Sequence, residues 1–172
     1  MGALELLAIV VFFLIGYWAV SALWPVKKAA APEARVTVRV SRRFDAAPER
    51  VFDAWLDRQT AGQWLFATPT GQMSVVEIDP RVGGAFTFID RRDGEDIAHT
   101  GEYLEIDRPR RLAFTFRVPK FSNESTPIRV DFAPSGAGCD LVLVHEGVFP
   151  EYASRTEQGW GQILDGLAKS LG

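Results

Sequence analysis

An uncharged run of nineteen residues, from Leu6 to Trp24, constrains this chain more than any other feature of its sequence. As a helix rising ~1.5 Å per residue, the run would extend roughly 28 Å, close to the hydrocarbon thickness of a bilayer. The rings of Tyr17, Trp18 and Trp24 suit a membrane interface. The run therefore predicts a single transmembrane helix that anchors the rest of the chain.

A cleaved secretory signal is the competing interpretation, because the alanines at 29–31 resemble a small-residue cleavage site. A signal peptide carries basic residues before its apolar region, whereas here Glu5 precedes the run and Lys27 and Lys28 follow it. Positive flanks tend to stay in the cytoplasm. We therefore expect a single-pass protein of an inner or plasma membrane, with its C-terminal domain in the cytoplasm.

The chain divides into a predicted anchor (1–26), an Ala/Pro linker (27–34) and one domain (35–172) of a size that supports one core. It carries 19 Lys and Arg against 22 Asp and Glu, and no basic stripe, so we expect no nucleic-acid partner. Its single cysteine, Cys139, excludes an intramolecular disulfide and favours a reducing compartment. Two histidines and one cysteine without paired spacing predict no metal site, and nothing indicates a cofactor.

Alternating apolar and polar residues in the domain predict strands separated by Gly, Pro and Asp turn signals. A helix start at Asp45 to Pro48, followed by apolar residues at helical spacing, predicts a first helix, and a short second helix is expected at 61–65. The series is typical of an antiparallel meander. The expected strands are 35–44, 73–79, 85–90, 97–106, 112–118, 128–133 and 140–145.

The last segment, 151–171, predicts one long amphipathic helix with an apolar face. Three glycines within it, Gly159, Gly161 and Gly166, each cost about 1 kcal/mol relative to alanine in a helix interior. Their presence indicates either close packing or open space along the helix. The face comprises Ala153, Thr156, Trp160, Ile163, Leu164, Leu167 and Leu171.

Several phrases of the domain, in this order, resemble the START-like SRPBCC superfamily, in the branch of homologues of the activator of the heat-shock chaperone ATPase. The resemblance covers nearly all of 35–172. It implies an α+β helix-grip fold, in which a curved antiparallel sheet wraps around a long C-terminal helix and leaves a cavity between them. The phrases that carry it are APERVFDAW (47–55), IDPRVGGAF (78–86), GEYLEI (101–106), LAFTF (112–116), HEG (145–147) and GW (159–160).

Side chains that share inward faces by alternation, together with the apolar face of the final helix, would line such a cavity. The alternative is that they simply fill a core, since buried aromatic rings stabilise a domain without any ligand. The candidate ligand-binding residues are Phe86, Phe88, Phe114, Phe116, Phe132, His145, Trp160, Ile163, Leu164 and Leu167.

His145 shares the apolar face of its strand with Leu141 and Leu143, so it is either a polar anchor for a ligand or a core histidine with an internal partner. Neither a nucleophile nor an acid partner can be identified beside it. The sequence therefore predicts no catalytic residue, and we expect a protein that is not an enzyme.

The leading functional hypothesis is a membrane-anchored domain that binds an apolar small molecule or lipid. The alternative is an accessory subunit of a larger membrane protein complex, docked through its span, because Gly16, Ala19, Ser21 and Ala22 would permit close helix approach in lipid. An aromatase or cyclase type of enzyme is a lesser possibility of the superfamily. Co-chaperone activity is suggested by the family name alone.

Overall fold

The structure is a computed structural model that describes residues 34–172. The predicted span at 6–24, and with it the expected anchor and topology, lie outside the described residues. Within residues 34–172, every helix is too short or too polar to cross a bilayer.

Seven strands form one antiparallel sheet in the order β1-β7-β6-β5-β4-β3-β2. The strands from β2 to β7 pair consecutively, which confirms the predicted meander, whereas β1 pairs with β7 and places Val38 opposite His145. The strands are β1 (Val36–Phe44), β2 (Gln72–Ile78), β3 (Ala85–Arg92), β4 (Glu95–Asp107), β5 (Arg111–Phe116), β6 (Thr126–Ser135) and β7 (Gly138–Val148).

Within residues 34–172, three α-helices accompany the sheet: α2 (Pro48–Leu56), α3 (Arg58–Trp64) and α4 (Ala153–Leu171). The second helix begins earlier than the predicted 61–65, because the Asp57 carboxylate caps it by accepting the Thr60 N–H at 2.7 Å. The final helix begins later than the predicted 151, because a 3₁₀ turn, η1 (Pro150–Tyr152), precedes it.

Strand β5 ends at Phe116, two residues before the end of the predicted strand 112–118, so Val118 lies outside it. Beyond Phe116 the chain enters the loop at 117–125, whose first residue, Arg117, forms an isolated bridge with Thr100. Strand β6 begins two residues before the predicted 128, at Thr126, which extends its inward face by one side chain.

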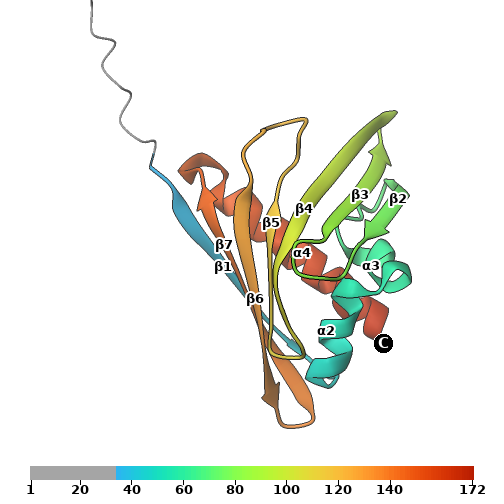
Figure 1. The fold of residues 1–172 in the computed structure, drawn as a ribbon, viewed down its shortest axis with the longest axis vertical. Helices are drawn as coiled ribbons and strands as arrows, with labels where there is room; N and C mark the ends of the chain where they lie inside the picture. The colour runs from blue at the N-terminus through green and yellow to red at the C-terminus, as the bar shows by residue number, and fades with distance from the viewer. Residues whose placement is uncertain (1–33) are drawn as a thin grey trace, which may run out of the picture. The chain divides into compact units, whose positions relative to one another are not determined.

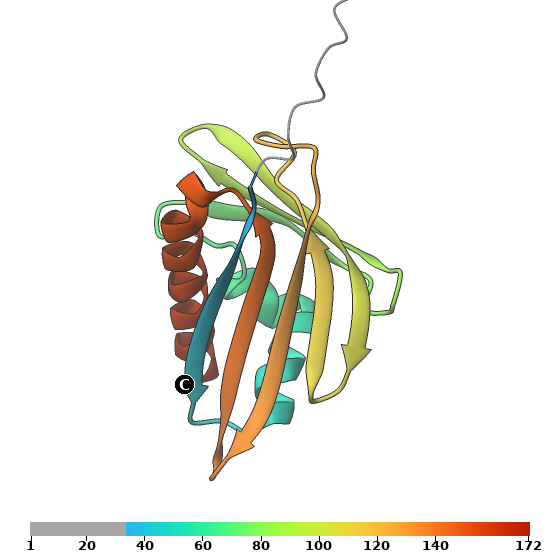
Figure 2. The ribbon, with the colours of Figure 1, turned by 90° about the vertical axis from the view of Figure 1, so that its left-hand side faces the viewer.

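The sheet curves around α4, as Figures 1 and 2 show, and the space between them is the hydrophobic core. Gly101 permits tight packing in β4. A Cβ there would lie 1.9 Å from the Thr115 carbonyl oxygen and 2.5 Å from the Phe86 ring, so any side chain would displace both. This arrangement is the helix-grip architecture that the sequence predicted.

Both predicted roles of the glycines occur in α4. A Cβ at Gly166 would lie 3.3 Å from Trp64 Cβ, so this glycine lets α4 pack closely on α3. Gly159 and Gly161 have no atom within 4 Å of the position a Cβ would take. These two therefore face open space.

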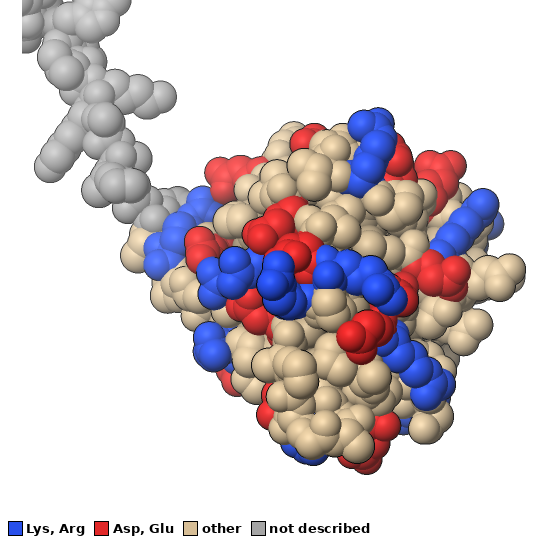
Figure 3. Space-filling view, turned by 60° about the horizontal axis from the view of Figure 1, so that its bottom comes forward, with Lys and Arg blue, Asp and Glu red and all other residues tan. Residues whose placement is uncertain are grey.

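Ion pairs cover the end of the fold shown in Figure 3, where basic and acidic side chains intermingle. The Arg108 guanidinium holds the Asp53 carboxylate through two hydrogen bonds of 2.7 and 2.8 Å. These bonds lower the pKa of Asp53 below its usual value. Nearby, Arg111 and Arg129 share Asp131 on neighbouring strands.

Candidate functional site

The structure brings together the ten side chains predicted to line a cavity. All of them lie in the space between the sheet and α4. Eight are buried, while Phe116 and Ile163 are half-buried. The predicted set is therefore one spatial cluster, and its members also form much of the hydrophobic core.

His145 sits in a short hydrogen-bonded chain. The Trp160 N–H donates to His145 Nδ1 at 3.1 Å, and Thr126 Oγ1 lies 2.8 Å from His145 Nε2. An indole nitrogen can only donate, so Nδ1 is the acceptor and the imidazole proton resides on Nε2. Nε2 then donates to the Thr126 hydroxyl, which in turn donates to the Phe116 carbonyl oxygen at 3.3 Å. Both ring nitrogens are thus occupied.

Burial lowers the pKa of His145 from 6.5 to about 4, because the charged imidazolium would lose its hydration. The ring is therefore neutral at pH 7. A neutral ring matches the tautomer that the Trp160 and Thr126 contacts require.

A second group of buried polar side chains is centred on His99 of β4. Its ring stacks on Phe66, with centroids 4.7 Å apart and planes 3° from parallel. Burial, together with the nearby positive charge of Arg92, lowers the pKa of His99 to about 4. Asp90, fully buried on β3, accepts a hydrogen bond of 2.7 Å from the Thr68 hydroxyl.

Phe66 connects the two histidine groups. Its ring lies 5.2 Å from Phe116, which in turn lies 5.8 Å from His145, and it also lies 5.9 Å from Trp160. Phe66 belongs to the segment between α3 and β2 and has a backbone φ of 60°. This left-handed conformation is rare for a bulky residue and costs about 1 to 3 kcal/mol. The surrounding rings hold it there.

Some buried polar atoms in this region have no hydrogen-bond partner among residues 34–172. They include His99 Nδ1, Asp90 Oδ1 and the indole nitrogens of Trp55 and Trp64. Most buried polar groups in folded proteins are paired, so unpaired ones mark a place where water or a ligand atom can bind.

One small void lies in the interior. A void of about 10 Å³ borders Trp55, enough for about one water molecule. Its other lining residues are Leu65, Phe86, Tyr103, Leu112 and Phe114. The same aromatic rings thus fill the core and would line the predicted cavity. They pack against one another, so a ligand that binds among them must displace some of them.

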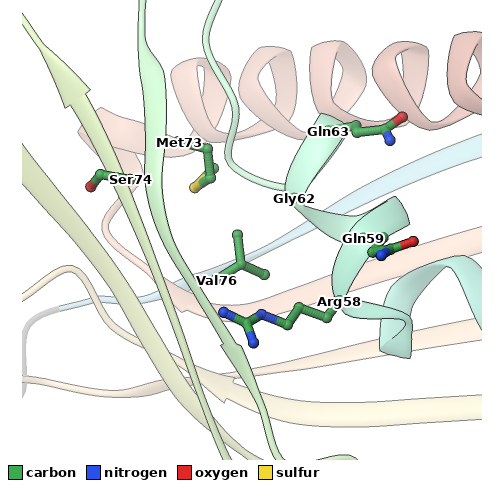
Figure 4. A pocket seen from close by; sticks show the side chains of 7 residues that line it. All are labelled: Arg58, Gln59, Gly62, Gln63, Met73, Ser74 and Val76. Carbon is green, nitrogen blue, oxygen red and sulfur yellow. The ribbon is translucent and has the colours of Figure 1, made fainter.

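An open groove of about 470 Å³ lies elsewhere, between α3 and the edge strand β2 (Figure 4). Gly62 brings the two elements close, since a Cβ there would lie 2.9 Å from Val76 Cγ2. Arg58 and the amides of Gln59 and Gln63 border the groove. None of the ten predicted ligand-binding residues lines it.

The remaining candidate chemistry is sparse in the described part of the chain. Within residues 34–172, His, Cys, Asp and Glu form no group of three or more that could hold a metal ion. Cys139 is fully buried on β7, and burial raises the pKa of its thiol. The thiolate is the reactive form, so this environment favours a structural cysteine.

Sequence reasoning missed His99, Trp55, Thr126, Asp90 and Phe66 as members of the site. Alternation could have found two of them: Thr126 precedes the inward residue Ile128 by two positions, and Asp90 follows Phe88 by two. Phe66 carried no such signal, because its burial in an irregular segment depends on elements that are distant in the sequence.

The curved antiparallel sheet, the gripped C-terminal helix and the aromatic interior define a START-like helix-grip protein. The sequence profile of the family described as Activator of Hsp90 ATPase homolog 1-like protein matches residues 45–172. The chain belongs to this family.

Solved structures share the fold. Protein CV1439 from Chromobacterium violaceum is 32% identical, with a TM-score of 0.71, and the match covers 77% of this chain and 94% of that one. The AHSA1-like protein from Aeromonas hydrophila is 19% identical, with a TM-score of 0.69 and coverage of 79% and 92%. CalU16 from Micromonospora echinospora is 20% identical, with a TM-score of 0.58 and coverage of 81% and 85%. No functionally curated protein matches the chain.

Proposed function

We propose that the domain is a non-catalytic binding module that holds an apolar small molecule or lipid chain between the sheet and α4. The observation that carries the proposal is the presence of His99 Nδ1 and Trp55 Nε1, buried among aromatic rings and without partners among residues 34–172. A buried polar atom left unpaired costs about 1 to 3 kcal/mol. An apolar ligand with one polar group would pair such an atom while its body leaves water.

Binding in this interior requires a side chain to move, and Phe66 is the one we expect to move. Its ring lies between the His99 and His145 groups, and its segment belongs to no helix or strand. The ligand would then occupy the place of the Phe66 ring.

The state of His145 supports binding over catalysis. A general base needs a free lone pair and a pKa near the working pH. The Nδ1 lone pair of His145 already accepts from Trp160, and its pKa is about 4. The residue is instead suited to fixing the shape of the interior.

We also propose that the apolar run at 6–24 tethers this module to a membrane, with Lys27 and Lys28 on the cytoplasmic side. The support for the tether comes from the sequence. Docking of the span against another membrane protein would make the chain an accessory subunit. This prediction rests on the same apolar run.

Gentle detergent extraction of the full chain followed by native mass spectrometry tests the binding role. We expect a small apolar molecule retained by the protein. A spectrum of ligand-free chain, together with failure of the following cavity experiment, would refute the proposal.

The cavity experiment uses indole and indene, which share an apolar body but differ in one N–H group. Phe66→Ala should open space over the face of the His99 ring, because the two rings are stacked with their planes 3° from parallel. The variant should bind both compounds, since aromatic rings border this space and the Nδ1 lone pair, which lies in the plane of the imidazole, does not point into it.

Phe44→Ala is the matched control, because Phe44 is buried in the same core but pairs with Cys139, at the other end of β7 from His145. It should bind both compounds less tightly than Phe66→Ala, because its cavity lies away from the Phe66 ring. Failure of Phe66→Ala to bind either compound more tightly than Phe44→Ala would contradict the role assigned to Phe66.

A further inference from the structure

The end of the fold at which the described chain begins carries two exposed aromatic side chains. Large exposed apolar side chains are few in residues 34–172, namely Val82, Leu104, Phe121 and Tyr152. Phe121, in the loop at 117–125, is 73% exposed, and Tyr152, in η1, is 54% exposed. Figures 1 and 2 show this loop and the connection from β7 to α4 at the same end as the start of β1.

Arg35 joins these segments. Its guanidinium forms an ion pair of 2.9 Å with Glu124 in the loop, donates to the Gly147 carbonyl oxygen at 3.2 Å and lies 3.4 Å from the centre of the Phe149 ring. The Phe149 ring packs edge to face with Tyr152. Arg35, near the start of the described chain, therefore holds both aromatic segments in place.

We propose that this end, formed by the 117–125 loop and η1, is a membrane-contacting face whose Phe121 and Tyr152 rings enter the interfacial layer of the bilayer. The inference rests on the proposed tether. The linker at 27–34 spans at most about 28 Å when fully extended, and it joins the domain at Ala34, at this same end. The occupant of the face is thus the bilayer that would hold residues 6–24.

The charges at this end are consistent with contact through aromatic rings rather than through attraction to anionic lipid. Arg35 is paired with Glu124, and Lys120 is paired with Glu95. Paired charges leave little net positive charge to attract phosphate groups. The end of the fold shown in Figure 3 also carries intermingled charged side chains. The Tyr152 ring can bury its apolar body while its hydroxyl stays in water, and the Phe121 ring is apolar throughout.

The face also lies next to the polar part of the interior. Phe116 and Thr126 flank the 117–125 loop, and Thr126 contacts His145 directly. Trp160, which completes that chain of hydrogen bonds, lies in the first half of α4. Contact of this end with lipid would therefore place the proposed ligand-binding interior next to the bilayer, which is a source of apolar molecules.

The test places a fluorophore at single cysteines in the full chain, reconstituted into vesicles of phosphatidylcholine alone or in equal parts with phosphatidylglycerol. Phe121→Cys and Tyr152→Cys probe the proposed face. Ala137→Cys, in the exposed hairpin between β6 and β7, probes the opposite end, and Leu104→Cys probes an exposed apolar position far from the face. Cys139 is fully buried, so the unmodified chain supplies the labelling background.

We expect labels at Phe121 and Tyr152 to shift to shorter wavelength and to lose most of their fluorescence when the vesicles contain spin-labelled lipid. Labels at Ala137 and Leu104 should do neither, and both vesicle compositions should behave alike. Equal quenching at all four sites would overturn the membrane-contacting face while leaving the tether intact. Absence of quenching at every site of a chain that floats with the vesicles would do the same, and it is the result expected if the face instead binds a protein. A chain that fails to float with vesicles would overturn the tether and this inference with it.

Discussion

Acidification from pH 7 to pH 5 should destabilise the folded domain through its two buried histidines. Burial lowers the pKa of both His99 and His145 to about 4, whereas an unfolded chain titrates its histidines near 6.5. Between these values the unfolded state binds more protons than the folded state. Stability therefore falls as the pH drops below about 6.5, and the loss continues until the folded rings protonate near pH 4.

One pKa unit corresponds to about 1.4 kcal/mol, so the linkage relation gives a loss of roughly 2 kcal/mol per histidine between pH 7 and pH 5, and roughly 4 kcal/mol for both. The carboxylates whose pKa values are lowered by arginine partners, Asp53, Asp107 and Asp131, titrate below this window. Asp90 and Arg92 act on His99 in opposite directions, while burial alone acts on His145.

Urea unfolding of the fragment 34–172, followed at several pH values, measures this slope. His145→Gln and His99→Gln should each remove about half of it, because glutamine does not titrate. Phe44→Leu, in the same core, should lower stability at every pH and leave the slope unchanged. A slope that survives in both glutamine variants would refute the assignment of the pH dependence to these rings.

Further predictions concern α4 and the anchor. Gly159→Ala and Gly161→Ala should each stabilise the domain by about 1 kcal/mol in urea unfolding, because a Cβ meets open space at both positions. Gly166→Ala should stabilise the domain less, or destabilise it, because its Cβ would press on Trp64. Trp160→Ala should cost about 3 to 5 kcal/mol, since the residue is buried. Trp160→Phe should lose less packing energy than Trp160→Ala but leave His145 Nδ1 unpaired. A loss of unfolding free energy below about 1 kcal/mol in Trp160→Ala would mean that the Trp160 ring fills no essential space. A reporter fused after Gly172 should be active in the cytoplasm, and export of the reporter would reverse the predicted topology. Exchanging the apolar run for an unrelated span should keep the protein in the membrane and remove any co-purifying partner; retention of every partner would reject docking through the span.

The sequence by itself determined most of the local structure of the domain. Period-two alternation located every strand of the meander, and the spacing of Trp160, Leu164 and Leu167 identified the buried face of α4. Asp93 and Gly94 lie between the expected strands 85–90 and 97–106, and both have the positive φ that a tight hairpin between β3 and β4 requires. These features depend on residues close together in the chain, so local patterns are sufficient to reveal them.

Tertiary structure decided how the site is assembled. The pairing of β1 with β7 joins strands about a hundred residues apart, and it sets Val38 opposite His145. The Trp160 hydrogen bond selects the tautomer of His145, and the rings around Phe66 hold a backbone conformation that its own sequence disfavours. Whether the aromatic interior is a filled core or an open cavity also depends on how these distant side chains pack. Such contacts form between segments that only the complete fold brings together, and alternation within any one strand carries no information about them.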